Sequence, residues 1–309
     1  MIIDTHTHLW SKEIPSDDYW VGFVKISAKL AGRPEEKVRE RLPGWWDLSG
    51  DLLVQDMDEA EIDKSVLLPI DWYGFAGTEE SVSLDRQHRI FAEAVNRHPE
   101  RLILFGAVNP KRPAAAQFVE RAVKEWAIKG LKMHPCYGQF YPNEPECYLV
   151  YEKAQELGLV ISMHTGHEIY PAKSKYAQPI YLDEVAVDFP DLRIILDHVG
   201  NPYWLEAASI ANNKPNVYVD LAWWQPKILG NSVENFYKPL RTIIDTVGVS
   251  RVLFGSDWPA LRQVSRLRGK VWVDAFKNPP EVVKEAGIEF TEQEMNAILG
   301  DNAAKLLAL

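Results

Sequence analysis

The chain has 309 residues, of which 46% are hydrophobic and 25% charged, the composition of an ordinary globular protein. This composition excludes a disordered tail, a fibrous repeat and a collagen-like chain. The net charge of −10, from 34 basic and 44 acidic side chains, opposes binding to polyanions. We therefore expect neither nucleic acid nor a membrane surface as a partner.

The cysteines and the apolar runs indicate where the protein works. Cys136 and Cys147 are too few for a disulfide framework, and two thiols fit a reducing compartment. The first residues have neither a basic stretch nor a long apolar run, so no signal peptide is expected. No apolar run approaches the ~18 residues of a membrane helix. We expect a cytoplasmic protein that acts on a small molecule, and we leave open whether it forms a homodimer.

Eight short apolar runs alternate with amphipathic helical patterns along the chain. They lie at residues 1–4, 65–70, 102–108, 130–133, 159–163, 193–196, 216–219 and 252–254. They are rich in Val, Ile and Leu, as are strands that are buried on both faces. This alternation predicts one α/β domain over residues 1–309, a (β/α)8 TIM barrel. An open doubly wound sheet is the alternative, but no G-x-G-x-x-G pattern follows the first run.

A long insertion, about residues 10–50, follows the first predicted strand. It contains a charged piece with a helical pattern at residues 33–41. In a barrel this segment would lie over the face that carries the active site, because that face is built from the loops that follow the strands.

Histidine and aspartate side chains stand at the ends of four predicted strands. His6 and His8 are two residues apart on the first strand, so both point the same way. His164, His198 and Asp257 directly follow later strands. Any one of them could merely cap a helix. Together they should converge at the active-site face, where several imidazoles and a carboxylate would suit a divalent transition metal with an open position for water.

These residues stand in motifs that resemble the amidohydrolase superfamily. The motifs are His-x-His at 6–8, Gly-Leu-Lys-Met-His-Pro at 130–135, His-Thr-Gly at 164–166, Asp-His-Val-Gly-Asn-Pro at 197–202, Leu-Phe-Gly-Ser-Asp-Trp-Pro at 253–259 and Ile-Leu-Gly-Asp-Asn-Ala at 298–303. The chain is most similar to the amidohydrolase-related branch that includes 2-amino-3-carboxymuconate-6-semialdehyde decarboxylase. The likeness covers nearly the whole chain. Hydrolases, decarboxylases and a hydratase share these motifs, so they indicate the fold and the metal rather than the reaction.

The resemblance implies that His6, His8, His164 and Asp257 bind one divalent metal, with His198 bonded to the metal's water or to the substrate. We expect zinc, with manganese or iron as alternatives. Asp257 would relay a proton, because the other ligands are neutral. His198 could polarise a carbonyl or stabilise the anion that develops on it.

Lys132 and His134 point inward from the same predicted strand. In some superfamily members a carboxylated lysine on this strand bridges two metals, so a binuclear site is an alternative. We favour a lysine that binds a substrate carboxylate or pairs with a nearby acid. His167 would contact the substrate or make a loop hydrogen bond, and we expect His88, in a predicted helix, to be solvated.

Tryptophan is abundant, with 11 residues. Trp72, Trp223 and Trp224 lie just beyond strand ends and could line a pocket for an apolar or aromatic substrate. The alternative is that these rings pack the loops together.

Two reactions are compatible with the sequence. The first is hydrolysis of an amide, ester or lactone by a metal-activated water. The second is non-oxidative decarboxylation of an aromatic or muconate-like acid. Decarboxylation needs a cation for the carboxylate, and no Arg stands immediately after a predicted strand, which favours hydrolysis. A non-catalytic binding protein is disfavoured, because Asp257 and His198 would then have no task.

Overall fold

The strands of the protein, seen in a computed structural model that describes residues 1–15, 17–75 and 81–309, all pair in parallel. They run in the order β1-β2-β3 in one sheet and β4 to β9 in another. Their bounds are β1 Ile3–Thr7, β2 Lys64–Leu67, β3 Leu102–Leu104, β4 Gly106–Ala107, β5 Gly130–Met133, β6 Val160–Met163, β7 Arg193–Leu196, β8 Val217–Asp220 and β9 Val252–Leu253. The eight predicted runs correspond to these strands.

Two features connect the two sheets in the strand order of a closed barrel. β3 and β4 flank Phe105, and β3 pairs with β2 while β4 pairs with β5. At the other edge, the Thr5 amide donates to the Phe254 carbonyl at 3.0 Å, and the Asp257 amide donates to the His6 carbonyl at 2.8 Å. The predicted (β/α)8 fold is confirmed.

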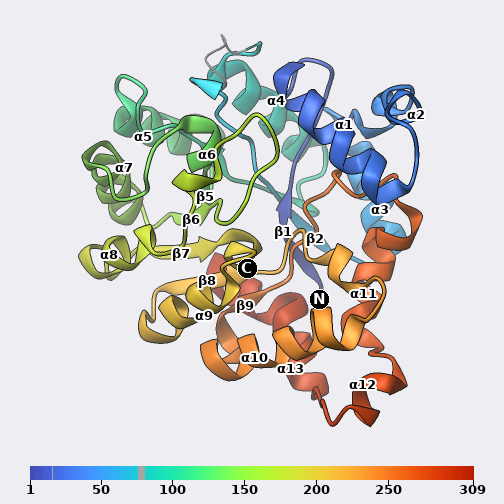
Figure 1. The fold of residues 1–309 in the computed structure, drawn as a ribbon. Coiled ribbons are helices and arrows are strands. Elements are labelled where there is room, and N and C mark those ends of the chain that lie inside the picture. The colour runs from blue at the N-terminus through green and yellow to red at the C-terminus, as the bar shows by residue number, and fades with distance from the viewer. Residues whose placement is uncertain (16, 76–80) are drawn as a thin grey trace.

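Helices surround the strands (Figure 1). They are α3 Asp51–Ala60, α4 Leu84–Arg97, α5 Ala115–Trp126, α6 Pro135–Gly138, α7 Pro145–Glu156, α8 Tyr181–Asp188, α9 Trp204–Asn213, α10 Lys238–Val247, α11 Gly269–Lys277, α12 Glu281–Glu285, α13 Glu292–Asn296 and α14 Asn302–Leu307. The helices bury an apolar face, as α10 does with Leu240, Ile243 and Ile244. A capping box formed by Thr291 and Glu294 begins α13.

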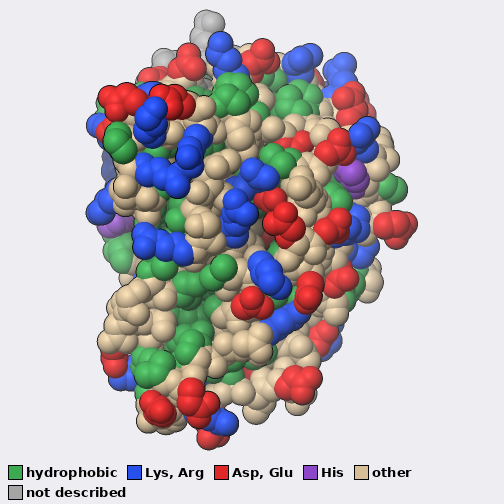
Figure 2. Space-filling view, turned by 90° about the vertical axis from the view of Figure 1, so that its right-hand side faces the viewer, with side chains coloured by type: hydrophobic (Ala, Val, Ile, Leu, Met, Phe, Trp, Pro, Cys, Tyr) green, Lys and Arg blue, Asp and Glu red, His purple; other side chains and the backbone are tan. Residues whose placement is uncertain are grey.

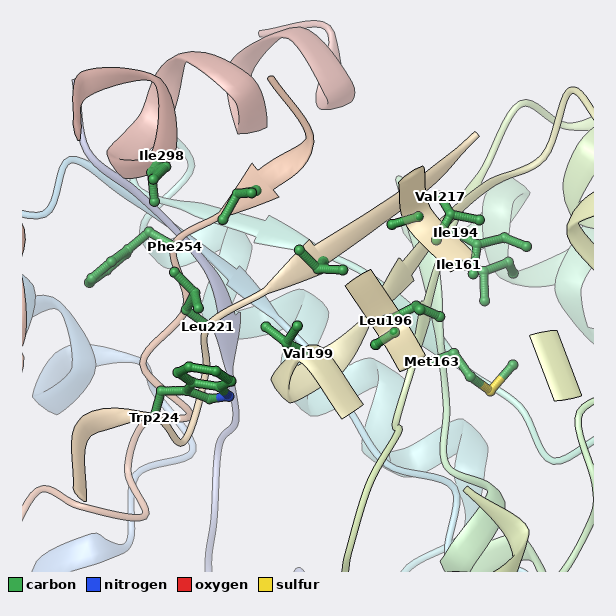
Figure 3. Close-up of a cluster of buried hydrophobic side chains, with 14 of the residues drawn as sticks. Ile161, Met163, Ile194, Leu196, Val199, Val217, Leu221, Trp224, Phe254 and Ile298 are labelled. Carbon is green, nitrogen blue, oxygen red and sulfur yellow. The ribbon is translucent and has the colours of Figure 1, made fainter. Parts of the chain in front are cut away.

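The apolar core has an outer and an inner part. The outer part packs the strands against the helices, and Figure 3 shows a portion of it around Leu196, Val199 and Phe254. The inner part is formed by Ile3, Val66, Val160, Ile195 and Leu253 of the strands, Phe105 between β3 and β4, and Ala303 and Leu306 of α14. Each fully buried Leu, Ile or Val side chain contributes about 1.5–3 kcal/mol.

The insertion after β1 contains α1 (Asp17–Ala31), α2 (Glu35–Arg39) and a 3-10 turn, Leu42–Trp45. The predicted helical piece corresponds to α2, and the longer α1 was not predicted. We call the buried rings that attach this insertion the aromatic cluster: Trp10, Tyr19, Trp20, Phe23, Trp45, Trp72, Phe75 and Tyr137. Because Trp72 and Phe75 follow β2 and Tyr137 lies in α6 directly after β5, the insertion packs over the C-terminal ends of the strands.

The surface mixes both signs of charge. On the face shown in Figure 2, Lys and Arg side chains lie among Asp and Glu side chains. Within the described ranges, every helix is too short or too polar to cross a membrane.

Candidate metal centre

A cavity of about 690 Å³, including its part open to solvent, lies at the C-terminal ends of the strands. It is lined by His6, His8, Trp10, Tyr19, Phe23, Ile26, Ile70, Lys132, His134, Tyr137, His164, His167, Glu168, Ile169, His198, Asn201, Trp223, Asp257 and Ala260. The structure thus brings together all the histidines and the aspartate that were predicted as metal-binding or catalytic.

His6 of β1 and His8, just after this strand, reach the cavity, and their hydrogen bonds fix which ring nitrogen carries the proton in the neutral ring. His6 Nδ1 lies 2.9 Å from Asp220 Oδ2, and His8 Nδ1 lies 2.6 Å from the Leu68 carbonyl oxygen. Both oxygens accept, so each Nδ1 donates. In the neutral rings each Nε2 then presents a lone pair, which is the usual arrangement of metal-binding histidines, although His6 Nε2 also lies 3.3 Å from Lys132 Nζ.

His164 is fixed in the same way by a relay through His198. His198 Nδ1 lies 3.0 Å from the Ala222 carbonyl oxygen and must donate to it. His198 Nε2 therefore accepts, in the neutral ring, from His164 Nδ1 at 3.2 Å. This leaves a lone pair on His164 Nε2, a buried atom without a hydrogen-bond partner in the described part of the chain.

Asp257 faces both histidines of β1. Its Oδ1 lies 3.2 Å from His8 Nε2 and 3.8 Å from His6 Nε2. With these tautomers the facing atoms are all acceptors, so a cation between them would satisfy them. Ligand atoms about 2.0–2.1 Å from a tetrahedral ion lie roughly 3.3 Å apart, which these distances approach. The donor set of His6, His8 and Asp257 therefore fits a divalent metal.

Shifts in pKa keep the candidate histidine ligands in the form that binds a metal. Burial, followed by the charge of Lys132, lowers the pKa of His6, and burial followed by the charge of His134 lowers that of His164. Both rings are therefore neutral at physiological pH, the form that binds metals.

Lys132 forms a buried ion pair with Asp197. Asp197 also accepts a hydrogen bond from Ser162 Oγ at 2.8 Å, and Lys132 Nζ lies 3.3 Å from His6 Nε2. An ammonium paired in this way does not suit carboxylation, which requires the neutral amine. The structure matches the alternative in which Lys132 pairs with a nearby acid.

Glu168 is a cavity residue that the sequence analysis missed. Its Oε2 lies 3.3 Å from His134 Nε2 and 3.4 Å from His164 Nε2. The His134 ring stacks on Tyr137, with centroids 3.5 Å apart. Burial raises the pKa of Glu168 to about 7. Glu168 stands in a loop four residues after His164, so a search of strand ends overlooks it.

Asp220 is a second missed residue, although it does end a strand. Besides bonding His6, its carboxylate accepts from the amides of His198, at 2.8 Å, and Ala222, at 3.0 Å. It therefore orients His6 and His198 together.

The backbone is strained around this cavity. His198, Val199, Trp223 and Asp257 have φ of 59°, 48°, 61° and 56°, in the left-handed region. This region is uncommon for residues other than glycine and is a clear outlier for a β-branched valine. Such strain concentrates at functional sites.

The predicted substrate residues divide into two groups. His134, His167 and Trp223 line the cavity, and the exposed His167 has its Nε2 3.1 Å from the Tyr203 hydroxyl. Trp72 and Trp224 are buried and are not among the lining residues. Trp72 belongs to the aromatic cluster, while Trp224, visible in Figure 3, donates from Nε1 to the His198 carbonyl at 2.7 Å.

Comparison with known proteins agrees with this geometry. A sequence profile of the amidohydrolase family matches residues 3–309. The chain belongs to the amidohydrolase family. The resemblance inferred from the motifs is thereby confirmed.

Curated relatives of this amidohydrolase are distant. Protein fluG of Emericella nidulans is 28% identical over 134 residues, which cover 41% of this chain but only 15% of fluG.

Solved structures share the fold over the full length. An uncharacterized TIM-barrel protein of Bordetella bronchiseptica has a TM-score of 0.73 at 19% identity, covering 99% of this chain and 98% of its own. A 5-carboxyvanillate decarboxylase of Novosphingobium aromaticivorans with bound manganese has a TM-score of 0.69 at 19% identity, covering 100% and 97%. A probable 2-pyrone-4,6-dicarboxylic acid hydrolase of Acinetobacter baumannii has a TM-score of 0.65 at 16% identity, covering 100% and 99%.

Proposed function

We propose that this amidohydrolase is a metal-dependent hydrolase that uses water to cleave an amide, ester or lactone of an apolar or aromatic small molecule. One observation carries the proposal: with its Nδ1 donating to the Leu68 carbonyl, a neutral His8 turns its Nε2 lone pair toward Asp257 Oδ1, 3.2 Å away. A divalent cation is the group that such an arrangement suits.

The proposed ligands of this single ion are His6, His8, His164 and Asp257. Each histidine offers an Nε2 lone pair, and the carboxylate offsets part of the ionic charge. We propose zinc as the ion. Manganese, which a structural relative holds, and iron are alternatives.

A bound divalent ion polarises a carbonyl oxygen and lowers the pKa of a water molecule to about 7. Asp257 would accept the proton of that water, because it is the carboxylate of the proposed ligand set and its side chain is 16% exposed toward the cavity. His198 would stabilise negative charge on the substrate once its Nε2 is protonated.

The residues of the cavity wall favour an uncharged, planar substrate. Trp10, Tyr19, Phe23 and Trp223 contribute aromatic surface. Among the described lining residues there is no arginine, and Lys132, the one lysine, is paired with Asp197. Residues 16 and 76–80, outside the described ranges, include no Lys or Arg. Since the metal would be the main cation available, a substrate with several carboxylates is disfavoured.

Decarboxylation of an aromatic acid is the second candidate function. It is favoured by the full-length similarity in fold to the manganese-containing decarboxylase. In this alternative the ion would hold the substrate's carboxylate, and the aromatic wall would hold its ring.

The two reactions are separable by their products. The metal-loaded protein would be assayed with aryl esters, lactones and anilides for acid release, and with hydroxybenzoates for CO₂ release. The proposal expects acid release that Asp257→Asn lowers by about 10²–10⁴-fold. CO₂ release without hydrolysis would replace it with the second candidate. Metal binding without turnover of any compound would support a binding protein instead.

A further inference from the structure

His164 Nε2 and Glu168 Oε2 form an unusual pair on the cavity wall. They lie 3.4 Å apart, and His164 Nε2 is buried without a hydrogen-bond partner among the described residues. The relay from Ala222 through His198 places the proton of neutral His164 on Nδ1, so Nε2 presents a lone pair. An ionised carboxylate also only accepts. Two acceptors that face each other in a buried place require a cation or a proton between them.

His134 does not provide a hydrogen-bond donor for His164 Nε2. Its Nδ1 accepts from the Tyr137 amide at 3.4 Å, so its proton is on Nε2, 3.3 Å from Glu168 Oε2. This N–H can assist Glu168, as does the Tyr137 hydroxyl, which hydrogen-bonds to the carboxyl group. Both contacts position Glu168 and leave His164 Nε2 unsatisfied.

Lys132 does not provide a hydrogen-bond donor for His164 Nε2 either. Its ammonium pairs with Asp197 and approaches His6 rather than Glu168. The site therefore combines a free imidazole lone pair with a carboxylate that two neighbours orient, as is usual for the carboxylate ligands of metals.

We propose that Glu168 is a further protein ligand of the divalent ion, binding on the same side as His164. This inference rests on the proposed function, because it assigns another residue to the same metal. The distance of 3.4 Å between Glu168 Oε2 and His164 Nε2 is similar to the 3.2 Å between Asp257 Oδ1 and His8 Nε2. Both distances suit two ligands of one ion. With Asp257, Glu168 would balance the double positive charge of the ion.

Titration of the metal-depleted full-length protein with Co²⁺ alone tests this assignment, since visible absorption of the bound ion reports its ligands without any substrate. The variants are Glu168→Gln, which keeps the shape of the side chain, and Glu168→Asp, which withdraws the carboxylate. Asp257→Asn tests the metal centre itself. Glu144→Gln, a partly exposed carboxylate paired with Lys111, is the matched control.

The expected result is a Kd for Co²⁺ at least tenfold higher in both Glu168 variants, with a changed absorption spectrum, while Glu144→Gln behaves like the wild type. Thermal unfolding without metal would show that Glu168→Gln is folded. If Glu168→Gln binds Co²⁺ with the wild-type Kd and spectrum while Asp257→Asn loses affinity, a proton rather than the metal joins Glu168 to His164, and the inference is overturned. If Asp257→Asn also binds normally, the metal-dependent function itself fails.

Discussion

The Lys132 ammonium and the Asp197 carboxylate form an ion pair between β5 and the turn after β7, with side chains only 1% and 0% exposed. The pair lies beside His6, one of the candidate metal ligands. A charge buried here is tolerated because its partner is in contact with it, and either charge alone would be strongly unfavourable.

Lys132→Met should therefore destabilise the protein by about 3–5 kcal/mol, because Asp197 remains as an unpaired buried charge. Urea unfolding of the metal-free protein at neutral pH measures the loss. The double variant Lys132→Met/Asp197→Asn should recover much of it. A loss below about 1 kcal/mol in the single variant, the range of exposed pairs, would mean that the pair is not desolvated as the structure shows.

His198→Asn should lower kcat while leaving metal content nearly unchanged, because His198 is placed beside the ligands and is not one of them. Asparagine tolerates the left-handed backbone, at φ 59°, better than most residues, so the turn should persist. Kinetics and elemental analysis of the same preparation are the measurements. A variant stripped of metal would show that His198 is itself a ligand.

Trp223→Ala and Trp224→Ala should have opposite consequences. Trp223 lines the cavity, so its loss should raise KM more than it lowers Tm. Trp224 is fully buried and bonded to the His198 carbonyl, so its loss should cost about 3–5 kcal/mol of stability. KM and Tm measured for both variants decide the matter, and an unchanged KM in Trp223→Ala would remove this ring from the substrate site.

Asp4→Asn should gain stability relative to the wild type as the pH rises. Burial raises the pKa of Asp4 from 3.8 to about 7. Between these values the unfolded chain releases a proton that the folded protein keeps, so the wild type loses stability through this group as the pH rises. The Tm of Asp4→Asn minus that of the wild type should increase from pH 5 to pH 7 and level off above. A difference that stays constant over this interval would contradict the raised pKa.

The barrel could be predicted from the sequence because its strands are local, continuous apolar runs. What escaped prediction depends on distant partners. Helix α1 is stabilised by rings such as Trp20 and Phe23, which pack in the aromatic cluster with residues from other loops. The prediction that His88 is solvated was wrong. This side chain is fully buried, and its Nδ1 donates to the Leu84 carbonyl while its Nε2 accepts from the Ala107 amide.

The predicted histidines and Asp257 line one cavity because alternation along a strand and the common edge of parallel strands decide where such side chains point. Their supporting residues were missed, although Asp220 does end a strand. Asp220 bonds His6 across 214 positions of the chain, and Glu168 enters from an irregular loop. The sequence also does not show which tryptophans face the cavity, because Trp223 and Trp224 are adjacent in sequence but differ in burial.

The most direct test of the account is metal analysis of protein purified without chelator, combined with turnover of a compound from the ester and lactone panel before and after chelation. The account predicts about one divalent ion per chain, loss of turnover when it is removed and recovery when zinc or manganese is restored. Metal-free protein with full turnover would contradict it.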